Sequence, residues 1–373
     1  MAESTRLVDL IQAGIDGFLD DRVPVLAEVS PDLAPFIDYS RELLRGGKRF
    51  RALFCYWGWQ AVQSLGDELD PLPRQASDEE LASVVLTATA LEVFHAAALV
   101  HDDIIDNSDT RRGMPAAHRR FETLHRQGRW AGDPGTFGES GAILLGDLLL
   151  GWSDELFDTA THLLDSRQKM DAARSEFTRM RTEVTLGQYL DILEERAWSS
   201  VPEDELLPRA QRVIVYKSAK YSIEAPLAIG ATMGGGTTAQ LASLRAYGLP
   251  LGIAFQLRDD LLGVFGDAEQ TGKPSGDDLR EGKRTVLIAH ARTRLPANAV
   301  RLLDELLGDP ELDAQQVSML QASIRASGAV EEVERIIARN VRTALAAIGD
   351  AQISSASKSQ LASLAETVAQ RSA

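Results

Sequence analysis

The chain has 373 residues, 44% apolar and 25% charged, an ordinary globular composition that excludes a disordered or collagen-like protein. Its 39 basic and 55 acidic residues give a net charge of −16, which argues against general binding to nucleic acids or anionic membranes. The single cysteine, Cys55, can form neither an internal disulfide nor a zinc cage of cysteines. Residues 1–21 are acidic and amphipathic and lack the basic start of a signal peptide. We therefore predict a soluble, cytoplasmic protein.

Helical periodicity dominates the sequence. Residues 81–100 are rich in alanine and leucine without glycine or proline, and residues 177–193 and 330–348 carry apolar side chains three and four positions apart. The most apolar stretch, residues 142–152, contains Asp147 and is too short to cross a bilayer. No run alternates apolar and polar residues between hairpin turns. The predicted fold class is all-α.

Two segments predict loops between helices. Residues 66–80 are acidic and contain prolines, and residues 128–141 contain five glycines. The glycine-rich loop is predicted to be a plain connector, because no strand precedes it and no Gly-Lys-Ser/Thr follows it. Pro226 lies inside an otherwise helical stretch and predicts a kink or a helix start. Neither loop is long enough to link domains, so a single domain over residues 1–373 is the simplest organisation.

An acidic cluster follows the helix predicted over residues 81–100. On a helix, Asp102, Asp103 and Asp106 fall within about 100° of arc, where three carboxylates repel one another unless a cation joins them. A site with few carboxylate oxygens and no imidazole cage suits Mg²⁺, whose shell is completed by substrate phosphates. A solvated acidic helix end is the alternative, and this motif alone does not decide between the two.

A second acidic pair, Asp259 and Asp260, follows another apolar helical run. It lies so far along the chain from Asp102 that the two clusters must come from different helices. Two facing carboxylate clusters form a multi-metal clamp for a diphosphate, whereas two solvated acidic faces are the alternative.

Basic residues occur beside these acidic clusters, where they can bind phosphate oxygens. The set comprises Lys48, Arg51, Arg111, Arg112, Lys217, Lys273 and Lys283. Taken singly, each is more often an ordinary surface charge. His95 lies almost two helical turns before Asp102 and shares its face, so it is either a buried core histidine or a ligand contact.

Several motifs occur in a fixed order. They are GGKRFR at 46–51, EVFH at 92–95 followed by LVHDDIIDNSDTRRG at 99–113, GQYLD at 187–191, KSA at 217–219, FQLRDD at 255–260 and TGKPSGDDLREGKRT at 271–285. With these motifs the chain resembles the trans-isoprenyl diphosphate synthases, also called polyprenyl synthetases, from about Tyr39 to Arg292.

The resemblance implies the isoprenoid synthase fold, a single all-α domain of many helices around a deep central pocket, usually in a homodimer. Residues 1–38 would form an N-terminal helical extension and residues 293–373 the C-terminal helices. It implies head-to-tail condensation of isopentenyl diphosphate with an allylic diphosphate (dimethylallyl, geranyl or farnesyl), with release of pyrophosphate. It also implies Mg²⁺, about three ions per active site, with no nucleic-acid partner and no stable membrane insertion.

The resemblance also implies residue roles. Mg²⁺ ions that hold the allylic diphosphate would bind Asp102, Asp106 and Asp259, supported by Asp103 and Asp260. The allylic diphosphate would contact Arg111, Lys217 and Lys273, and Lys283 is a further substrate-binding residue. Isopentenyl diphosphate would bind Lys48, Arg51, His95 and Arg112. Ser218 and Gln256 would face the allylic carbon, and with Lys217 and the carboxylates Asp102, Asp103, Asp106 and Asp259 they form the predicted catalytic set.

One position departs from the family pattern. The second motif usually reads Asp-Asp-x-x-Asp, but position 263 is Gly263. The next acid is Asp267, two turns beyond Asp260. We expect the second site to rely on Asp259 and Asp260, with weaker metal affinity.

Two rival functions share parts of this pattern. A class I terpene cyclase also has an Asp-Asp-x-x-Asp motif, but it would leave the basic residues of the isopentenyl diphosphate site without a role. A non-catalytic subunit of a heteromeric synthase typically loses an acidic cluster, and this chain keeps both.

Product length is predicted from the helix before Asp102. Family members that stop early place an aromatic residue four or five positions before this aspartate, where this chain has Ala98 and Ala97. Phe94 is the first bulky aromatic residue further down, about 12 Å below Asp102. Phe94 is either the floor of the pocket or only a core residue. The prediction is a product longer than farnesyl diphosphate, most simply geranylgeranyl diphosphate, with longer- and shorter-chain synthases as alternatives.

Overall fold

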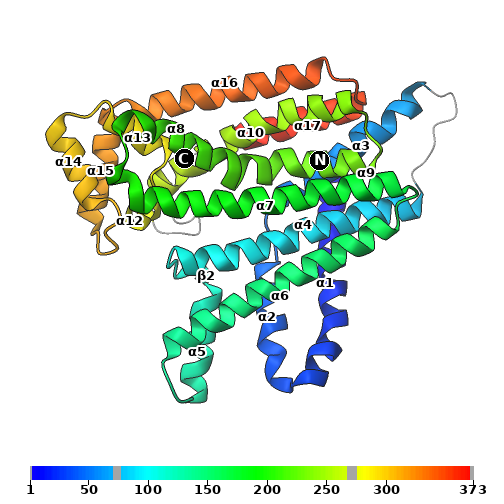
Figure 1. Cartoon of the computed structure of the whole chain (residues 1–373), viewed down its shortest axis with the longest axis horizontal. Coiled ribbons are helices and arrows are strands. Elements are labelled where there is room, and N and C mark those ends of the chain that lie inside the picture. The colour runs from blue at the N-terminus through cyan, green and yellow to red at the C-terminus, as the bar shows by residue number, and fades with distance from the viewer. Residues whose placement is uncertain (1, 70–76, 267–274, 370–373) are drawn as a thin grey trace.

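The computed structural model describes residues 2–69, 77–266 and 275–369, which are almost entirely helical, so the all-α prediction is confirmed (Figure 1). The first part of the chain forms α1 (Ala2–Val29), a 3₁₀ turn (Pro31–Leu33), α2 (Ala34–Leu43), α3 (Phe50–Leu69), α4 (Asp78–Ile105), strands β1 (Thr110–Arg111) and β2 (Met114–Pro115), α5 (Ala117–Gly128), α6 (Pro134–His162) and α7 (Arg167–Ala197). The second part forms a 3₁₀ turn (Trp198–Ser200), α8 (Glu203–Val213), a π-helix (Ile214–Glu224), α9 (Ala225–Met233), α10 (Thr238–Phe265), α12 (Asp277–Glu281), α13 (Val286–Arg292), α14 (Ala297–Leu306), α15 (Ala314–Ala326), α16 (Ala329–Gly349) and α17 (Ser355–Ala369).

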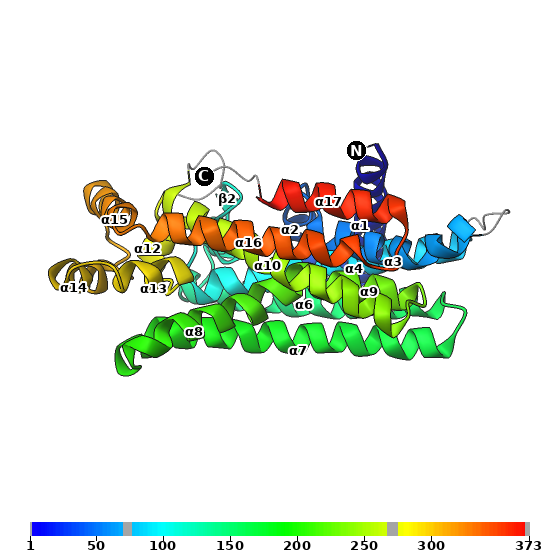
Figure 2. The same ribbon diagram turned by 90° about the horizontal axis from the view of Figure 1, so that it is seen from above.

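The long helices lie roughly along one axis, while α1 and α2 stand across them (Figure 1). Seen from above, α10 lies between α16 on one side and α7 on the other, and α12 to α15 gather at one end (Figure 2). Buried apolar side chains form two clusters. One joins α1, α3, α4, α6, α7 and α9 with the first half of α10 and with α17, and the other joins α8, the second half of α10 and α12 to α16. The site described below lies where these two halves meet.

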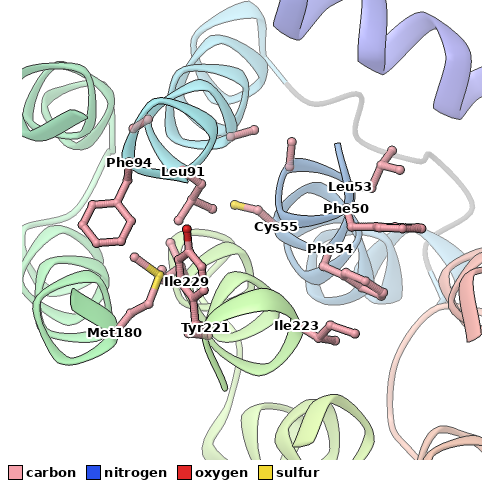
Figure 3. Packing of buried hydrophobic residues seen from close by; sticks show 14 of the residues in the cluster. Phe50, Leu53, Phe54, Cys55, Leu91, Phe94, Met180, Tyr221, Ile223 and Ile229 are labelled. Carbon is pink, nitrogen blue, oxygen red and sulfur yellow. The ribbon is translucent and has the colours of Figure 1, made fainter. Parts of the chain in front are cut away.

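Close contact between α3 and α9 depends on glycine. A Cβ atom added at Gly230 would overlap the backbone carbonyl of Cys55, and one added at Gly58 would overlap that of Leu227. The aromatic and aliphatic side chains of this region fill the space around the two helices (Figure 3). Burial also raises the pKa of the Cys55 thiol, so this cysteine is a packed core residue and a poor nucleophile.

The three predicted helical stretches are confirmed within α4, α7 and α16, but the glycine-rich loop is much shorter than expected. Only residues 129–133 connect α5 to α6, because Asp133 caps α6 by accepting a hydrogen bond from the Thr136 amide, and Pro134 fits the first turn. Gly138 and Gly141 are therefore helical. They let α6 pack against the His118 backbone and the Phe121 ring of α5.

Other local expectations also meet the structure. The predicted loop 66–80 is helical up to Leu69 and again from Asp78, and residues 70–76 lie outside the described part. Pro226 sits in the first turn of α9, directly after the π-helix, which confirms the predicted helix start. β1 and β2 form a short antiparallel pair that was not predicted, since two residues are too few to show an alternating pattern.

Helix α4 is both long and apolar. By length and composition it could cross a membrane, but 72% of its most apolar window is buried inside the bundle. Its apolar surface is therefore largely used in packing against α3 and α6.

Candidate active site

A cavity of about 900 Å³ opens among α3, α4, α7, the π-helix and α10. The predicted site residues that line it are Lys48, Arg51, His95, Ala98, Asp102, Asp106, Arg111, Arg112, Lys217, Ser218, Gln256, Asp259, Asp260 and Lys283. Those that do not line it are Phe94, Ala97 and Asp103. Lys273 and Asp267 lie outside the described residues. The fold thus gathers most of the predicted set around a single space.

The first acidic cluster lies at the C-terminal end of α4. The carboxylate of Asp102 accepts a hydrogen bond from Gln188 Nε2 of α7 at 2.8 Å. Asp103 points away from the cavity and is buried against Arg111 of β1, whose Nε donates to its Oδ1 at 2.9 Å. Arg111 also approaches Asp102 at 3.6 Å. Asp103 therefore acts by fixing Arg111 in the cavity wall.

Two lysines connect this cluster to α7. Lys217, in the π-helix, lies 3.3 Å from Asp102 and 2.5 Å from Asp191. Lys283, just beyond α12, lies 2.7 Å from Asp106 and 3.3 Å from Asp191. Asp191 is therefore shared between two lysines from different parts of the chain. A π-helical turn is a recurrent feature of functional sites, and here it carries Lys217 and Ser218.

Sequence reasoning gave no role to the α7 residues of this network. Gln188 and Asp191 stood in a motif of the resemblance, and Glu195, which accepts from Lys283 Nζ at 2.7 Å, stood in none. Gln188, Asp191 and Glu195 are three and four residues apart, the spacing of one helical face. That spacing was a signal from which the set could have been found.

The pKa values of Asp102 and Asp106, the two carboxylates of the first cluster that face the cavity, are shifted in opposite directions. Burial alone would raise the pKa of Asp102, but Lys217, Arg111 and Lys283 hold it well below its usual range. Burial, and after it the charge of Asp102, raises the pKa of Asp106 to about 7, although Lys283 opposes the change. Asp102 is thus ionised at neutral pH, whereas Asp106 binds a proton more readily than a free aspartate does.

The second acidic pair lies on α10 across the cavity. Asp260 is 5% exposed, and burial raises its pKa to about 7 against the hydrogen bond that Gln256 Nε2 donates at 2.8 Å. This hydrogen bond uses one of the two hydrogens of the Gln256 amide nitrogen and fixes the amide group at the cavity wall. Arg258 turns away from the cavity and pairs with Glu334 of α16 through both terminal nitrogens.

The carboxylates suit a divalent cation. Among the residues that the structure describes, Asp106 Oδ1 and Asp260 Oδ2 are buried side-chain oxygens without a hydrogen-bond partner. Buried carboxylate oxygens are costly unless a cation or donor meets them. Within residues 2–69, 77–266 and 275–369, no three or more acidic, histidine or cysteine side chains form a ready metal cage. Mg²⁺ typically takes only one or two carboxylates and completes its shell with water and phosphate oxygens.

The opposite wall carries the other cations. Arg51 donates to Ser222 Oγ at 2.9 Å, and its guanidinium lies 4.2 Å from the ring centre of Tyr221. His95 Nδ1 lies 3.0 Å from the Tyr221 hydroxyl. Burial, and after it Arg51 and Arg112, holds the pKa of His95 well below its usual range, so the imidazole is neutral at pH 7.

Arg112 is held by the glycine turn before α3. It donates to the carbonyls of Leu43 and Arg45, both at 3.3 Å. Its guanidinium also lies in van der Waals range of the position that a Gly47 side chain would take, and Gly47 has a φ of 86°. A bulkier residue at Gly47 would strain the backbone and crowd Arg112.

Of the chain-length residues, only Ala98 lines the cavity. Phe94 is buried one layer behind the wall, close to Tyr221 (Figure 3). Its ring centre lies 5.8 Å from that of Tyr221 and 6.3 Å from that of Phe177. Tyr221 does line the cavity. Phe94 therefore supports the wall through Tyr221.

Arg49, in the middle of the GGKRFR motif, has a different environment from Lys48 and Arg51. Its side chain is buried and pairs with buried Glu92 of α4 at 3.1 Å. It also donates to Gln12 of α1 at 2.7 Å. Sequence reasoning did not single out Arg49 or Glu92, because nothing in the motif distinguishes an inward arginine from its neighbours.

Comparisons with known proteins agree with this arrangement. Residues 35–324 match the family profile described as Polyprenyl synthetase. The chain is similar to the crystal structure of a geranylgeranyl pyrophosphate synthase from Corynebacterium glutamicum complexed with isoprenyl diphosphate and magnesium, with 38% identity and a TM-score of 0.90 over 98% of this chain and 99% of that one. It is 32% identical to chloroplastic geranylgeranyl pyrophosphate synthase 9 of Arabidopsis thaliana over 82% of this chain and 76% of the relative. It is 29% identical to a geranylgeranyl diphosphate synthase of Methanosarcina mazei over 88% and 87%, respectively.

Arg49 is buried and its neighbour Lys48 is exposed, so the two residues should differ in their contribution to stability. Arg49→Met should lower the free energy of unfolding by about 3–5 kcal/mol, because Glu92 is left buried without its counter-charge. Lys48→Met, at the exposed neighbouring position, should change it by less than about 0.5 kcal/mol. Urea denaturation followed by circular dichroism measures both, and equal losses in the two variants would contradict the structural role of Arg49.

Proposed function

Because the chain belongs to the polyprenyl synthetase family and is a trans-prenyltransferase that condenses an allylic diphosphate head-to-tail with isopentenyl diphosphate, we propose geranylgeranyl diphosphate as its main product. The observation that carries this function is the arrangement of two carboxylate clusters around one cavity, with Arg111, Lys217 and Lys283 beside the first. The small residue at Ala98 supports a product longer than farnesyl diphosphate.

The allylic diphosphate would bind between the two acidic clusters. Asp102, Asp106 and Asp259 would hold Mg²⁺, about three ions as a set, and the partnerless oxygens of Asp106 and Asp260 fit such ligands. When bound, Mg²⁺ would neutralise the diphosphate and make it a better leaving group. Arg111 and Lys217 carry fixed positive charge at the same place, and Lys273 and Lys283 would add to it.

The bond that breaks joins the allylic carbon to the diphosphate oxygen, and the electron pair leaves with pyrophosphate. The allylic cation must be stabilised by dipoles that do not attack it as nucleophiles. The Ser218 hydroxyl and the Gln256 carbonyl oxygen would supply such dipoles. The new carbon–carbon bond forms with the double bond of isopentenyl diphosphate. The proton lost from that substrate would pass to the departing pyrophosphate, and the apolar depth of the cavity would exclude water.

Isopentenyl diphosphate would bind at the opposite wall. Lys48, Arg51 and Arg112 supply cations there. His95 is neutral and so has one donor and one acceptor nitrogen, and its Nε2–H would donate to the substrate when Nδ1 accepts from the Tyr221 hydroxyl. Tyr221 orients both Arg51 and His95. The two substrates would then meet between Ser218 and Gln256.

We also propose a homodimer. Large apolar side chains on α6 and α7 are exposed, with Leu144 at 59% and Leu186 at 59%. Exposed large apolar side chains support a surface that a second subunit covers. Sedimentation velocity at micromolar concentration should give twice the mass of the chain, and a monomer under these conditions would contradict the dimer.

A cytoplasmic location is a further proposal. It is supported by the acidic composition and by the single buried cysteine, which suit a reducing compartment. Cell fractionation followed by immunoblotting should recover the chain with cytoplasmic enzymes, and recovery in the membrane pellet would contradict this location.

The reaction is tested by incubating this chain alone with radiolabelled isopentenyl diphosphate, an allylic primer and Mg²⁺. Label should enter a prenyl diphosphate, and excess chelator should abolish incorporation. Asp102→Ala should reduce turnover by several orders of magnitude, since it removes charge stabilisation at the leaving group. Conversion of the allylic substrate without incorporation would instead indicate a cyclase, and incorporation only with a second chain would indicate a non-catalytic subunit.

The division between the two substrate sites is tested kinetically. Arg112→Ala or Lys48→Ala should raise the KM for isopentenyl diphosphate about ten- to a hundredfold, as expected from losing a charge-assisted contact of about 1.5–3 kcal/mol. The KM for the allylic substrate should change much less. Equal changes for both substrates would show that these cations do not form a separate site.

Product length is tested on α4. Ala98→Phe should shorten the product, because the ring would fill space below Asp102 that the growing chain enters. Ala82→Phe, at an exposed position on the same helix, should leave the product unchanged. Chromatography of the products identifies them. Farnesyl diphosphate as the sole wild-type product would refute the proposed length, and an unchanged product in Ala98→Phe would assign length control to another helix.

A further inference from the structure

The residue after Lys283 is a buried arginine to which sequence reasoning gave no role. Arg284 lies in the short segment between α12 and α13, and its side chain is 10% exposed. Its guanidinium carbon lies 3.7 Å from the ring centre of Trp198, and its Nη1 lies 3.3 Å from Oδ1 of Asp304 on α14. Arg284 therefore joins the α12–α13 segment to two other parts of the fold.

Trp198 connects this segment to the helix that holds the lysines. It directly follows α7, the helix whose Asp191 and Glu195 accept hydrogen bonds from Lys283. Two consecutive residues, Lys283 and Arg284, thus contact the same end of α7, one through carboxylates and the other through an aromatic ring. A lysine on its flexible four-carbon stem does not fix the backbone that bears it, so the stacked arginine supplies the firmer attachment.

The charge balance around Trp198 is unfavourable for stability. Arg284 and Arg292 share one carboxylate, that of Asp304, and within the described ranges neither Nε atom has a hydrogen-bond partner. Burial, aided by the charge of Arg292 and opposed by that of Asp304, lowers the pKa of Arg284 to about 10, so the group stays charged at neutral pH. Buried ion pairs often stabilise a fold no more than apolar residues of similar volume. Stability alone therefore does not account for the second arginine.

We propose that Arg284 is a positioning residue for the condensation reaction. Held by Trp198 and Asp304, it fixes the α12–α13 segment against the end of α7. The Lys283 ammonium is thereby placed beside Asp106, at the wall where the allylic diphosphate would bind. This inference rests on the proposed function, because the place of Lys283 matters to the reaction only if a diphosphate binds beside it.

The first test separates positioning from stability. Arg284→Met leaves Arg292 and Asp304 as a balanced pair, so its urea midpoint should stay close to the wild-type value. Its kcat for incorporation of radiolabelled isopentenyl diphosphate should fall about 10- to 100-fold, as expected when a group near the reacting bond is displaced by about 1 Å. The KM for isopentenyl diphosphate should change little, because its proposed site lies on the opposite wall.

The same cluster supplies matched controls. Arg292→Met removes the same charge but leaves Arg284 with both of its partners, so kcat should remain at the wild-type value. Trp198→Leu should lower kcat as Arg284→Met does, whereas Trp198→Phe keeps an aromatic face and should retain most of the activity. Circular dichroism checks that each variant is folded.

Dependence on Lys283 supplies the decisive comparison. Lys283→Met should lower kcat, and adding Arg284→Met should cause no further loss, since Arg284 acts only through that lysine. Losses that multiply in the double variant, wild-type kcat in folded Arg284→Met, or an equal loss in Arg292→Met would overturn the inference. Absence of incorporation by the wild-type chain would instead refute the proposed function, on which the inference rests.

Discussion

The alternation of lysine and carboxylate between α4 and α7 is the interaction on which the site depends. Asp102, Lys217, Asp191, Lys283 and Asp106 form one chain of contacts between 2.5 and 3.3 Å. Any one of these groups would be costly to bury alone, because desolvation of a single charge outweighs most packing gains. Together they keep a highly charged cavity wall stable before any substrate arrives. When the carboxylates bind metal ions, the two lysines would be available to contact a diphosphate.

The same network explains why helix geometry is irregular at this point. Lys217 comes from a π-helix, where the wider turn shifts side chains relative to a regular α-helix. Gly187 of α7 has no room for a Cβ atom, because the backbone of Tyr216 and Lys217 lies against it. Close approach of the two backbones brings Lys217 within reach of Asp191 on α7. A regular helix or a larger residue at Gly187 would move the ammonium away from both carboxylates.

Much of the fold and site follows from the sequence because it depends on local rules. The long apolar periods predicted α4, α7 and α16, and the acidic and basic motifs named most residues that line the cavity. What the sequence did not reveal depends on contacts between distant segments. Arg284 reaches Trp198 only because of how the α12–α13 segment packs on the end of α7, and no spacing rule relates the two positions. Likewise, the predicted connector before α6 is too long, because its five glycines indicate a loop whereas Asp133 caps the helix and starts it at Pro134.

Each of the two aspartate-rich motifs also contains one residue that builds the fold while neighbouring carboxylates face the cavity. Asp103 pairs with Arg111, and Arg258 pairs with Glu334. An ion pair behind the wall fixes the direction of the adjacent side chains, because a helix turns each next residue by about 100°. With the inward residue anchored, its neighbour must point into the cavity. This physical coupling explains why charged residues occur in runs in a protein whose chemistry uses only some of them, and why loss of the inward member would disturb the site without touching substrate.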